Sequence, residues 1–161
     1  MLDLVTHLRY NRWAHLRLLE VCGSLPSEQL SRDLKSSYRG VYGTLLHIYQ
    51  GDSIWFSRLQ GEPAGSLSAI VPNPDFAAFR GNWENLHDRL VAWGEGLSEA
   101  GWRRPVGYRD SKGVAYTTPV FQIVLHLVNH GTYHRGQVAS MLRQLGVAPA
   151  GLDLILYFRG L

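Results

Sequence analysis

The sequence contains little cysteine, little lysine and no long apolar run. Cys22 is the single cysteine among 161 residues, so no disulfide can form within the chain, and a fold held together by disulfides is excluded. We interpret Cys22 as a buried structural thiol. No apolar stretch approaches the roughly 20 residues that span a bilayer. The N-terminal residues lack the basic and apolar regions of a targeting segment, so we expect a cytoplasmic protein by default.

The basic residues are scattered along the chain. The formal net charge is +3, and of the 16 basic residues only Lys35 and Lys112 are lysines. Proteins that bind nucleic acids usually gather their positive charge on one face or in one tail. The spread of the arginines therefore argues against a nucleic-acid partner.

Apolar residues recur at helical spacing in four long segments. The first covers residues 2–22 and ends at Gly23, and the second covers residues 42–59. A loop rich in glycine, proline and serine follows at residues 61–74 and is long enough to cross one end of a helix bundle.

The third segment has the strongest periodicity of the chain. Asn73 is the expected N-cap, with Pro74 at the first helical position and Asp75 in the first turn. Apolar side chains then follow at alternating intervals of three and four residues: Phe76, Phe79, Trp83, Leu86, Leu90, Trp93 and Leu97. This spacing predicts a face that packs into a bundle core.

The pattern changes to strand before the fourth segment. Residues 103–117 contain two short β-prone stretches around a turn at 110–113, which predicts a small hairpin. Thr118 is the expected cap of the fourth helix, with Pro119 at its first position. We expect this helix to run to Leu145 and to end at Gly146.

These elements predict an all-α fold, a four-helix bundle with a long crossover between helices 2 and 3 and a small β-hairpin before helix 4. A short apolar tail, LDLILYF, should pack back as a final helical turn or two. No composition shift marks a domain boundary, so we expect a single domain over residues 1–161.

Two histidines of the fourth segment, His130 and His134, stand four residues apart. This spacing places both imidazoles on one helical face, one turn apart, where they can bind one transition-metal ion. His47, in the second segment, could supply a third ligand. The alternative is a pair of core residues bonded to backbone carbonyls, and the spacing by itself does not choose between the two.

Neighbouring residues favour the metal site. Gly51 leaves the turn after His47 without a side chain, and Gly131 and Gly136 would let helices approach closely. An unpaired imidazole in an otherwise apolar helix would also be costly.

The remaining histidines are expected to have other roles. His126 stands one turn before His130, but three histidines at this spacing drift around the helix axis, so we place His126 outside the ligand set, beside the site or in the core. His7, His15 and His87 lack ligand-like spacing. Asn11 and His15 lie on the apolar face of the first helix, where they indicate either a cavity or two hydrogen-bonded core residues.

Three imidazoles without a carboxylate or a thiolate leave coordination positions open. Open positions are typical of catalytic metal sites, and closed ones of structural sites. A water bound to Zn²⁺ in such a site has a pKa near ~7 and provides hydroxide at neutral pH. A thiolate could occupy the same position.

The chain resembles the DinB family almost from end to end. The most specific segment is HLVNHGTYHRGQVASMLRQLG at 126–146, preceded in the family's order by YNRWAHLRLLE (10–20), YGTLLHIYQGDSIWFSRLQG (42–61) and YRDSKGVAYTTP (108–119). The resemblance implies a four-helix bundle, often a homodimer, with a divalent metal ion, Zn or Ni, held by His47, His130 and His134. The family's name refers to damage induction of a founding member and does not imply DNA binding.

Two functions fit the sequence. The first is a metal-dependent enzyme acting on a small electrophile, either as a hydrolase or as a thiol S-transferase that uses a low-molecular-weight thiol, as some relatives do with bacillithiol or mycothiol. Asn11 and His15 would then line the pocket, and Tyr133 or Arg135 would orient the substrate, although helix-surface packing is the simpler role for the last two. The second is a non-catalytic metal-binding module of the stress response.

Overall fold

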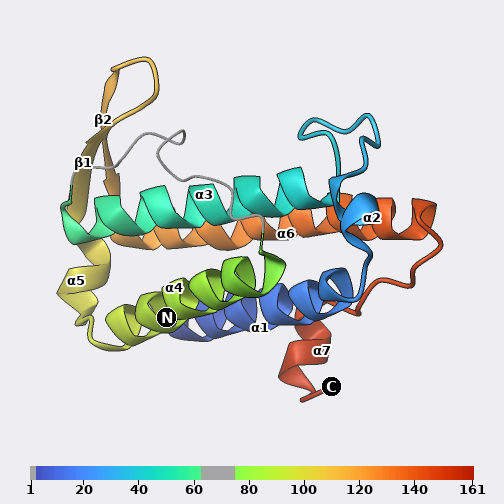
Figure 1. The fold of residues 1–161 in the computed structure, drawn as a ribbon. Helices are drawn as coiled ribbons and strands as arrows, with labels where there is room; N and C mark the ends of the chain where they lie inside the picture. Colours follow the sequence, from blue (N-terminus) through green and yellow to red (C-terminus); the bar gives the residue numbers. More distant parts are fainter. Residues whose placement is uncertain (1–2, 63–74) are drawn as a thin grey trace.

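The computed structural model describes residues 3–62 and 75–161, which are mostly helical (Figure 1). Four helices in this part of the chain are long: α1 (Leu4–Gly23), α3 (Val41–Gln60), α4 (Phe76–Glu95) and α6 (Val120–Gln144). Three are short: α2 (Ser27–Ser31), α5 (Glu99–Arg103) and α7 (Leu154–Phe158). None of the described helices is long and apolar enough to cross a membrane.

The long helices lie side by side in two pairs. α1 packs against α4 and α3 packs against α6, while α1 and α6 also contact each other (Figure 1). Their apolar faces meet in one core cluster, which includes fully buried leucines from each helix: Leu8, Leu45, Leu90 and Leu127. This packing places α3 and α6, the two helices that carry the candidate ligands, next to each other.

The apolar seam of α4 is confirmed as its core-facing side. Phe79, Trp83, Leu86 and Leu90 are buried, and the other three seam residues pack half-buried against the core. The predicted start is wrong by two positions, because the Asp75 carboxylate accepts hydrogen bonds from the backbone N–H groups of Ala77 and Ala78 and so acts as the N-cap. Asn73, Pro74 and most of the predicted crossover lie outside the described residues.

A two-stranded antiparallel hairpin precedes α6, as predicted. β1 (Pro105–Arg109) pairs with β2 (Ala115–Pro119), and Gly113 closes the turn with a positive φ of 82°. The predicted cap of α6 is wrong. Thr118 lies in β2, with its hydroxyl 3.2 Å from that of Tyr108, and Pro119 is the N-cap rather than the first helical residue. The strand ladder holds both residues extended, so the helix begins only after them.

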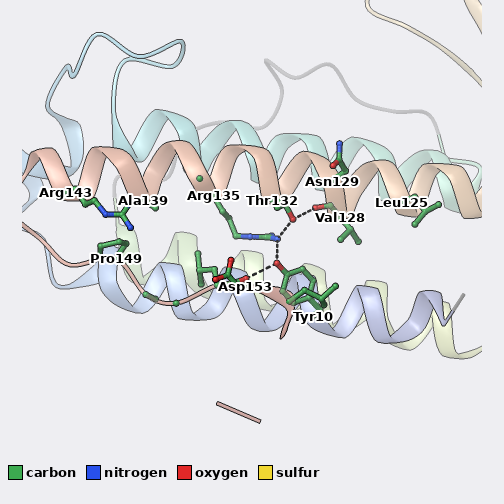
Figure 2. Close-up of a pocket in the computed structure, with 15 residues that line it drawn as sticks. Tyr10, Leu125, Val128, Asn129, Thr132, Arg135, Ala139, Arg143, Pro149 and Asp153 are labelled. Atoms are coloured by element: carbon green, nitrogen blue, oxygen red, sulfur yellow. Dashed lines mark hydrogen bonds between the residues drawn. The ribbon is translucent and has the colours of Figure 1, made fainter. Parts of the chain in front are cut away.

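A cavity of about 610 Å³ lies between α6, Tyr10 of α1 and the segment 149–154 (Figure 2). The Arg135 guanidinium lies at its wall and donates to the Thr132 hydroxyl at 2.8 Å. The Tyr10 hydroxyl donates to the carbonyl of Leu152 at 2.9 Å and so ties this segment to α1. None of the three candidate metal ligands lines this cavity.

Candidate metal centre

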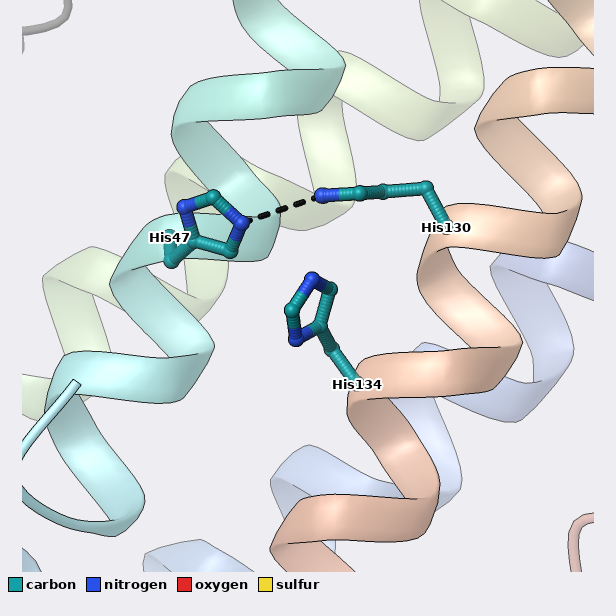
Figure 3. Close-up of side chains that lie close together, drawn as sticks. All are labelled: His47, His130 and His134. Atoms are coloured by element: carbon teal, nitrogen blue, oxygen red, sulfur yellow. Dashed lines mark hydrogen bonds between the residues drawn. The ribbon is translucent and has the colours of Figure 1, made fainter. Parts of the chain in front are cut away.

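His47 of α3 and both His130 and His134 of α6 direct their rings toward one another between the two helices (Figure 3). The Nε2 atoms of His47 and His130 lie 3.0 Å apart. One ligand nitrogen from each of the three rings lies within 4.8 Å of the others. The structure therefore brings together the three histidines that the sequence selects.

The Nε2 atoms of His47 and His130 are spaced as two ligands of one ion would be. Bonds of about 2.0–2.1 Å from an ion such as Zn²⁺ place two neighbouring nitrogens roughly 3.0–3.4 Å apart. Imidazole is a suitable ligand for Zn, Ni, Cu and Fe. The residues present therefore fit a divalent transition-metal ion.

Burial keeps the rings of His47 and His130 neutral at neutral pH. Desolvation, with a smaller contribution from the neighbouring His134, lowers the pKa of His47 and the pKa of His130 to about 4 each. A neutral imidazole has the lone pair that binds a metal, whereas a protonated ring does not. Burial thus prepares these side chains for metal binding.

Two further side chains orient the rings. The Nδ1 of His134 lies 2.8 Å from Oε1 of Gln137, and since an amide oxygen only accepts, Nδ1 carries the proton and Nε2 keeps its lone pair. Tyr38 stacks on His47, with ring centroids 3.9 Å apart and planes 13° apart. The sequence reasoning missed both residues. The spacing of three between His134 and Gln137 was an available signal, whereas Tyr38 precedes α3 and has no periodic pattern.

The glycines near the triad have different roles. A Cβ at Gly51 would lie 3.0 Å from Cε1 of His130, so Gly51 lets that ring approach α3. A Cβ at Gly131 would lie 2.8 Å from Oδ1 of Asn11, so Gly131 permits a close contact between α6 and α1, as predicted. The same prediction is wrong for Gly136, where no atom lies within 4 Å of the added Cβ.

Residues 1–160 match the model of the DinB family. The chain belongs to the DinB family. It is similar to Protein DinB of Bacillus subtilis (strain 168), with 27% identity over 153 residues that cover 92% of this chain and 89% of that protein. The family match spans both helices of the triad, and it confirms the resemblance that the sequence motifs indicate.

In this DinB-family protein, His126 lies outside the triad, as predicted. Its ring centroid is 5.7 Å from that of His130 and 5.3 Å from that of Trp55, and its side chain is exposed. The alternative of a core position for His126 is therefore wrong. Tyr133 is 66% exposed and sets its ring edge against His134, on the solvent side of the triad.

Asn11, His15 and Arg135 belong to a separate buried network. The Nη1 of Arg135 donates to Oδ1 of Asn11 at 2.6 Å and to Nε2 of His15 at 3.0 Å. These three side chains are at most 2% exposed. Of the two roles considered for Asn11 and His15, the structure shows the hydrogen-bonded core role. The prediction that Arg135 packs on the helix surface is wrong, because its side chain is buried.

The network continues from His15 to residues that the sequence reasoning did not select as a group. The Nδ1 of His15 lies 3.0 Å from Nε2 of His87, which in turn lies 3.0 Å from Oδ2 of Asp52. The Trp83 indole N–H donates to the same Oδ2 at 3.0 Å. The network therefore links α6, α1, α4 and α3 in turn.

His15, Asp52 and His87 also offer ligand atoms within 4.8 Å of one another, but the hydrogen bonds argue against an ion there. Arg135 can only donate, so Nε2 of His15 accepts. Burial lowers the pKa of His15 well below its ordinary value and keeps the ring neutral, so its single proton lies on Nδ1. That nitrogen is the one that an ion would need, and we interpret the group as a core network.

Proposed function

We propose that this DinB-family protein binds one divalent metal ion, Zn or Ni, through His47, His130 and His134, and that it is a metal-dependent enzyme acting on a small electrophile. The observation that carries the proposal is the convergence of three imidazoles from two helices, with two nitrogens 3.0 Å apart. The group contains no thiolate or carboxylate, so coordination positions stay open for a substrate.

The bound ion would supply a Lewis acid that favours the deprotonated form of a coordinated thiol or water. The protein's own residues prepare the site. Burial holds His47 and His130 neutral, Gln137 directs the Nε2 lone pair of His134 toward the other two rings, and Tyr38 restrains the plane of His47. The exposed Tyr133, whose ring lies against that of His134, would orient the substrate.

Within this class we propose thiol S-transfer, in which the sulfur of a low-molecular-weight thiol forms a bond to an electrophilic carbon and a leaving group departs with the bonding electron pair. The open coordination positions and the family membership support this reaction. Hydrolysis differs only in the nucleophile, which is then water.

We further propose that the four long helices form a four-helix bundle, that residues 1–161 are one domain, and that the protein is a homodimer. The contacts of α1 with α4, α3 with α6 and α1 with α6 support the bundle. Ile155, Phe158 and Leu161 are 50%, 56% and 62% exposed and offer apolar surface to a second copy. Light scattering of the purified protein should give the mass of two chains, and the mass of one chain would contradict the dimer.

Metal analysis of alanine variants tests the site. His47→Ala, His130→Ala and His134→Ala should each lose stoichiometric metal, because two remaining imidazoles bind an ion far more weakly than three. His7→Ala is the matched control, since among the described residues the His7 ring hydrogen-bonds only to the backbone carbonyl of Asp3, and it should keep its metal. Full occupancy in all three triad variants would overturn the ligand assignment.

Turnover assays then test the reaction. The metal-loaded protein should consume an electrophile such as an alkyl halide only when a low-molecular-weight thiol is added, and chelation should stop the reaction. Turnover without thiol would identify water as the nucleophile and so a hydrolase. Full metal occupancy without turnover under either condition would instead support the non-catalytic metal-binding module.

A further inference from the structure

Asp52 is a buried carboxylate that lies outside the three-histidine group. It belongs to α3, five residues after His47, and its side chain is fully buried. Its Oδ2 accepts from Trp83 and contacts His87, but its Oδ1 has no hydrogen-bond partner in the described part of the chain. Leaving a buried carboxylate oxygen unpartnered costs free energy, so a favourable interaction must stabilise this charge from elsewhere.

The carboxylate lies close enough to act on the triad. Gly51, the residue before Asp52, packs directly against the His130 ring. Asp52 thus places a negative charge on the helix of His47 and next to the residue that contacts His130. A charge that stabilises a proton on these rings also stabilises a metal cation bound to them, for the same Coulombic reason.

In the described part of the chain Asp52 pairs with no arginine or lysine, and its one neighbour able to carry a positive charge is His87, whose Nε2 lies 3.0 Å from Oδ2. Among residues 3–62 and 75–161, Asp52 is the one buried aspartate and Arg135 is the one buried arginine. The imidazoles of His15 and His87 lie between these two side chains. The hydrogen bonds of Arg135 all go to neutral groups: Tyr10, Asn11, His15 and Thr132. The charge of Asp52 therefore has no permanently charged partner in the described part of the chain.

We propose that Asp52 is the buried counter-charge of the three-histidine centre, and that its carboxylate, in contact with Trp83 and His87, strengthens the binding of a divalent cation. The inference rests on the proposed function, because it requires the triad to bind a metal. Three neutral imidazoles and a divalent ion carry a charge of +2 in a partly buried site, and an adjacent carboxylate offsets part of it. Removing a residue of this kind typically weakens metal binding by about 10- to 100-fold.

The substitution Asp52→Asn removes the charge and keeps the size of the side chain. The dissociation constant for Zn²⁺ is measured on the full chain, after metal removal, by competition with a chelating dye at neutral pH. Asp52→Asn should bind Zn²⁺ about 10- to 100-fold more weakly. Asp88→Asn, which removes an exposed α4 carboxylate paired with Arg12, is the matched control and should bind as the wild type does.

The two proposals fail in different ways. If the wild type binds Zn²⁺ through the triad and Asp52→Asn binds it equally well, the role of Asp52 is refuted and the proposed metal centre stands. If the wild type does not bind Zn²⁺, the proposed function fails first. Should Asp52→Asn not fold, the double variant Asp52→Asn/Arg135→Met removes both buried charges together, and the same loss of affinity is expected from it.

Binding of a monovalent ion distinguishes an effect of the Asp52 charge from an effect of its packing. Coulomb energy is proportional to the charge of the ion, so Asp52→Asn should weaken Ag⁺ binding by about the square root of the factor for Zn²⁺. Trp83→Phe removes a hydrogen bond to Asp52 but keeps the carboxylate, so it should reduce stability and leave Zn²⁺ affinity unchanged. Equal losses for Ag⁺ and Zn²⁺, or a loss in Trp83→Phe as large as in Asp52→Asn, would show that Asp52 acts through packing and would overturn the proposal.

Discussion

Two glycines of α6 should respond to alanine with opposite signs. At an open helical position, alanine is about 0.5–1 kcal/mol more favourable than glycine, because glycine loses more backbone entropy on folding. Gly136 is such a position, since nothing lies within 4 Å of an added Cβ. Gly136→Ala should therefore stabilise the protein by about 0.5–1 kcal/mol.

Gly131 offers no such space. An added Cβ would lie 2.7 Å from Nη1 of Arg135, 2.8 Å from Oδ1 of Asn11 and 3.1 Å from Nε2 of His15. These atoms are buried and hydrogen-bonded to one another, so they move only by losing those bonds. Overpacking costs about 1–3 kcal/mol and the loss of one hydrogen bond to a charged group about 1.5–3 kcal/mol, so after the helical gain Gly131→Ala should destabilise by about 2–5 kcal/mol.

Urea denaturation of the two variants and the wild type, followed by circular dichroism, measures both effects. For a chain of this length, 1 kcal/mol corresponds to a shift of about 2–4 °C in Tm, so thermal melts give a second estimate. If Gly131→Ala is as stable as the wild type, the network of Arg135, Asn11 and His15 is not packed against α6 as described. If Gly136→Ala is destabilised instead, its face of α6 is covered.

Two further predictions concern titration and reactivity. Acidification from about pH 6.5 to about pH 4 should lower the free energy of unfolding of the metal-free protein, because burial lowers the pKa of His47 and His130 from 6.5 to about 4 and the unfolded chain takes up protons first. Urea denaturation across this range should show a weaker pH dependence for His47→Gln, and stability that rises on acidification would contradict the sign. Burial also raises the pKa of the Cys22 thiol to about 12, so a disulfide reagent should modify it only after denaturation. Stoichiometric reaction of the folded protein would show that Cys22 is accessible.

The long helices could be predicted from the sequence because their apolar periodicity extends over many turns. The seam from Phe76 to Leu97 correctly identified the buried face of α4. The five-residue helices α2 and α5 could not be predicted in this way, since one turn and a half contains too few positions to show a period. The start of α6 was also misjudged, because Thr118 and Pro119 suit a helix start locally but are held in β2 by pairing with β1.

The candidate site also has a part that the sequence predicts and a part that it does not. A helix alone places His130 and His134 on one face, so two of the three ligands depend on local geometry. Arg135 and Asn11 are 124 residues apart in the sequence, and His15 and His87 are 72 apart, so no local pattern relates them. The expected roles of these residues were therefore the least reliable.

The sequence by itself determined where the long helices lie, which stripe of α4 is apolar, and that one face of α6 carries two stacked imidazoles. These properties follow from the 3.6-residue period of the helix, which is set within each segment. Only the tertiary structure decided that Gly51 admits the His130 ring and that Arg135 and Asp52 are buried. Such contacts depend on the register at which neighbouring helices pack, and the whole core sets that register.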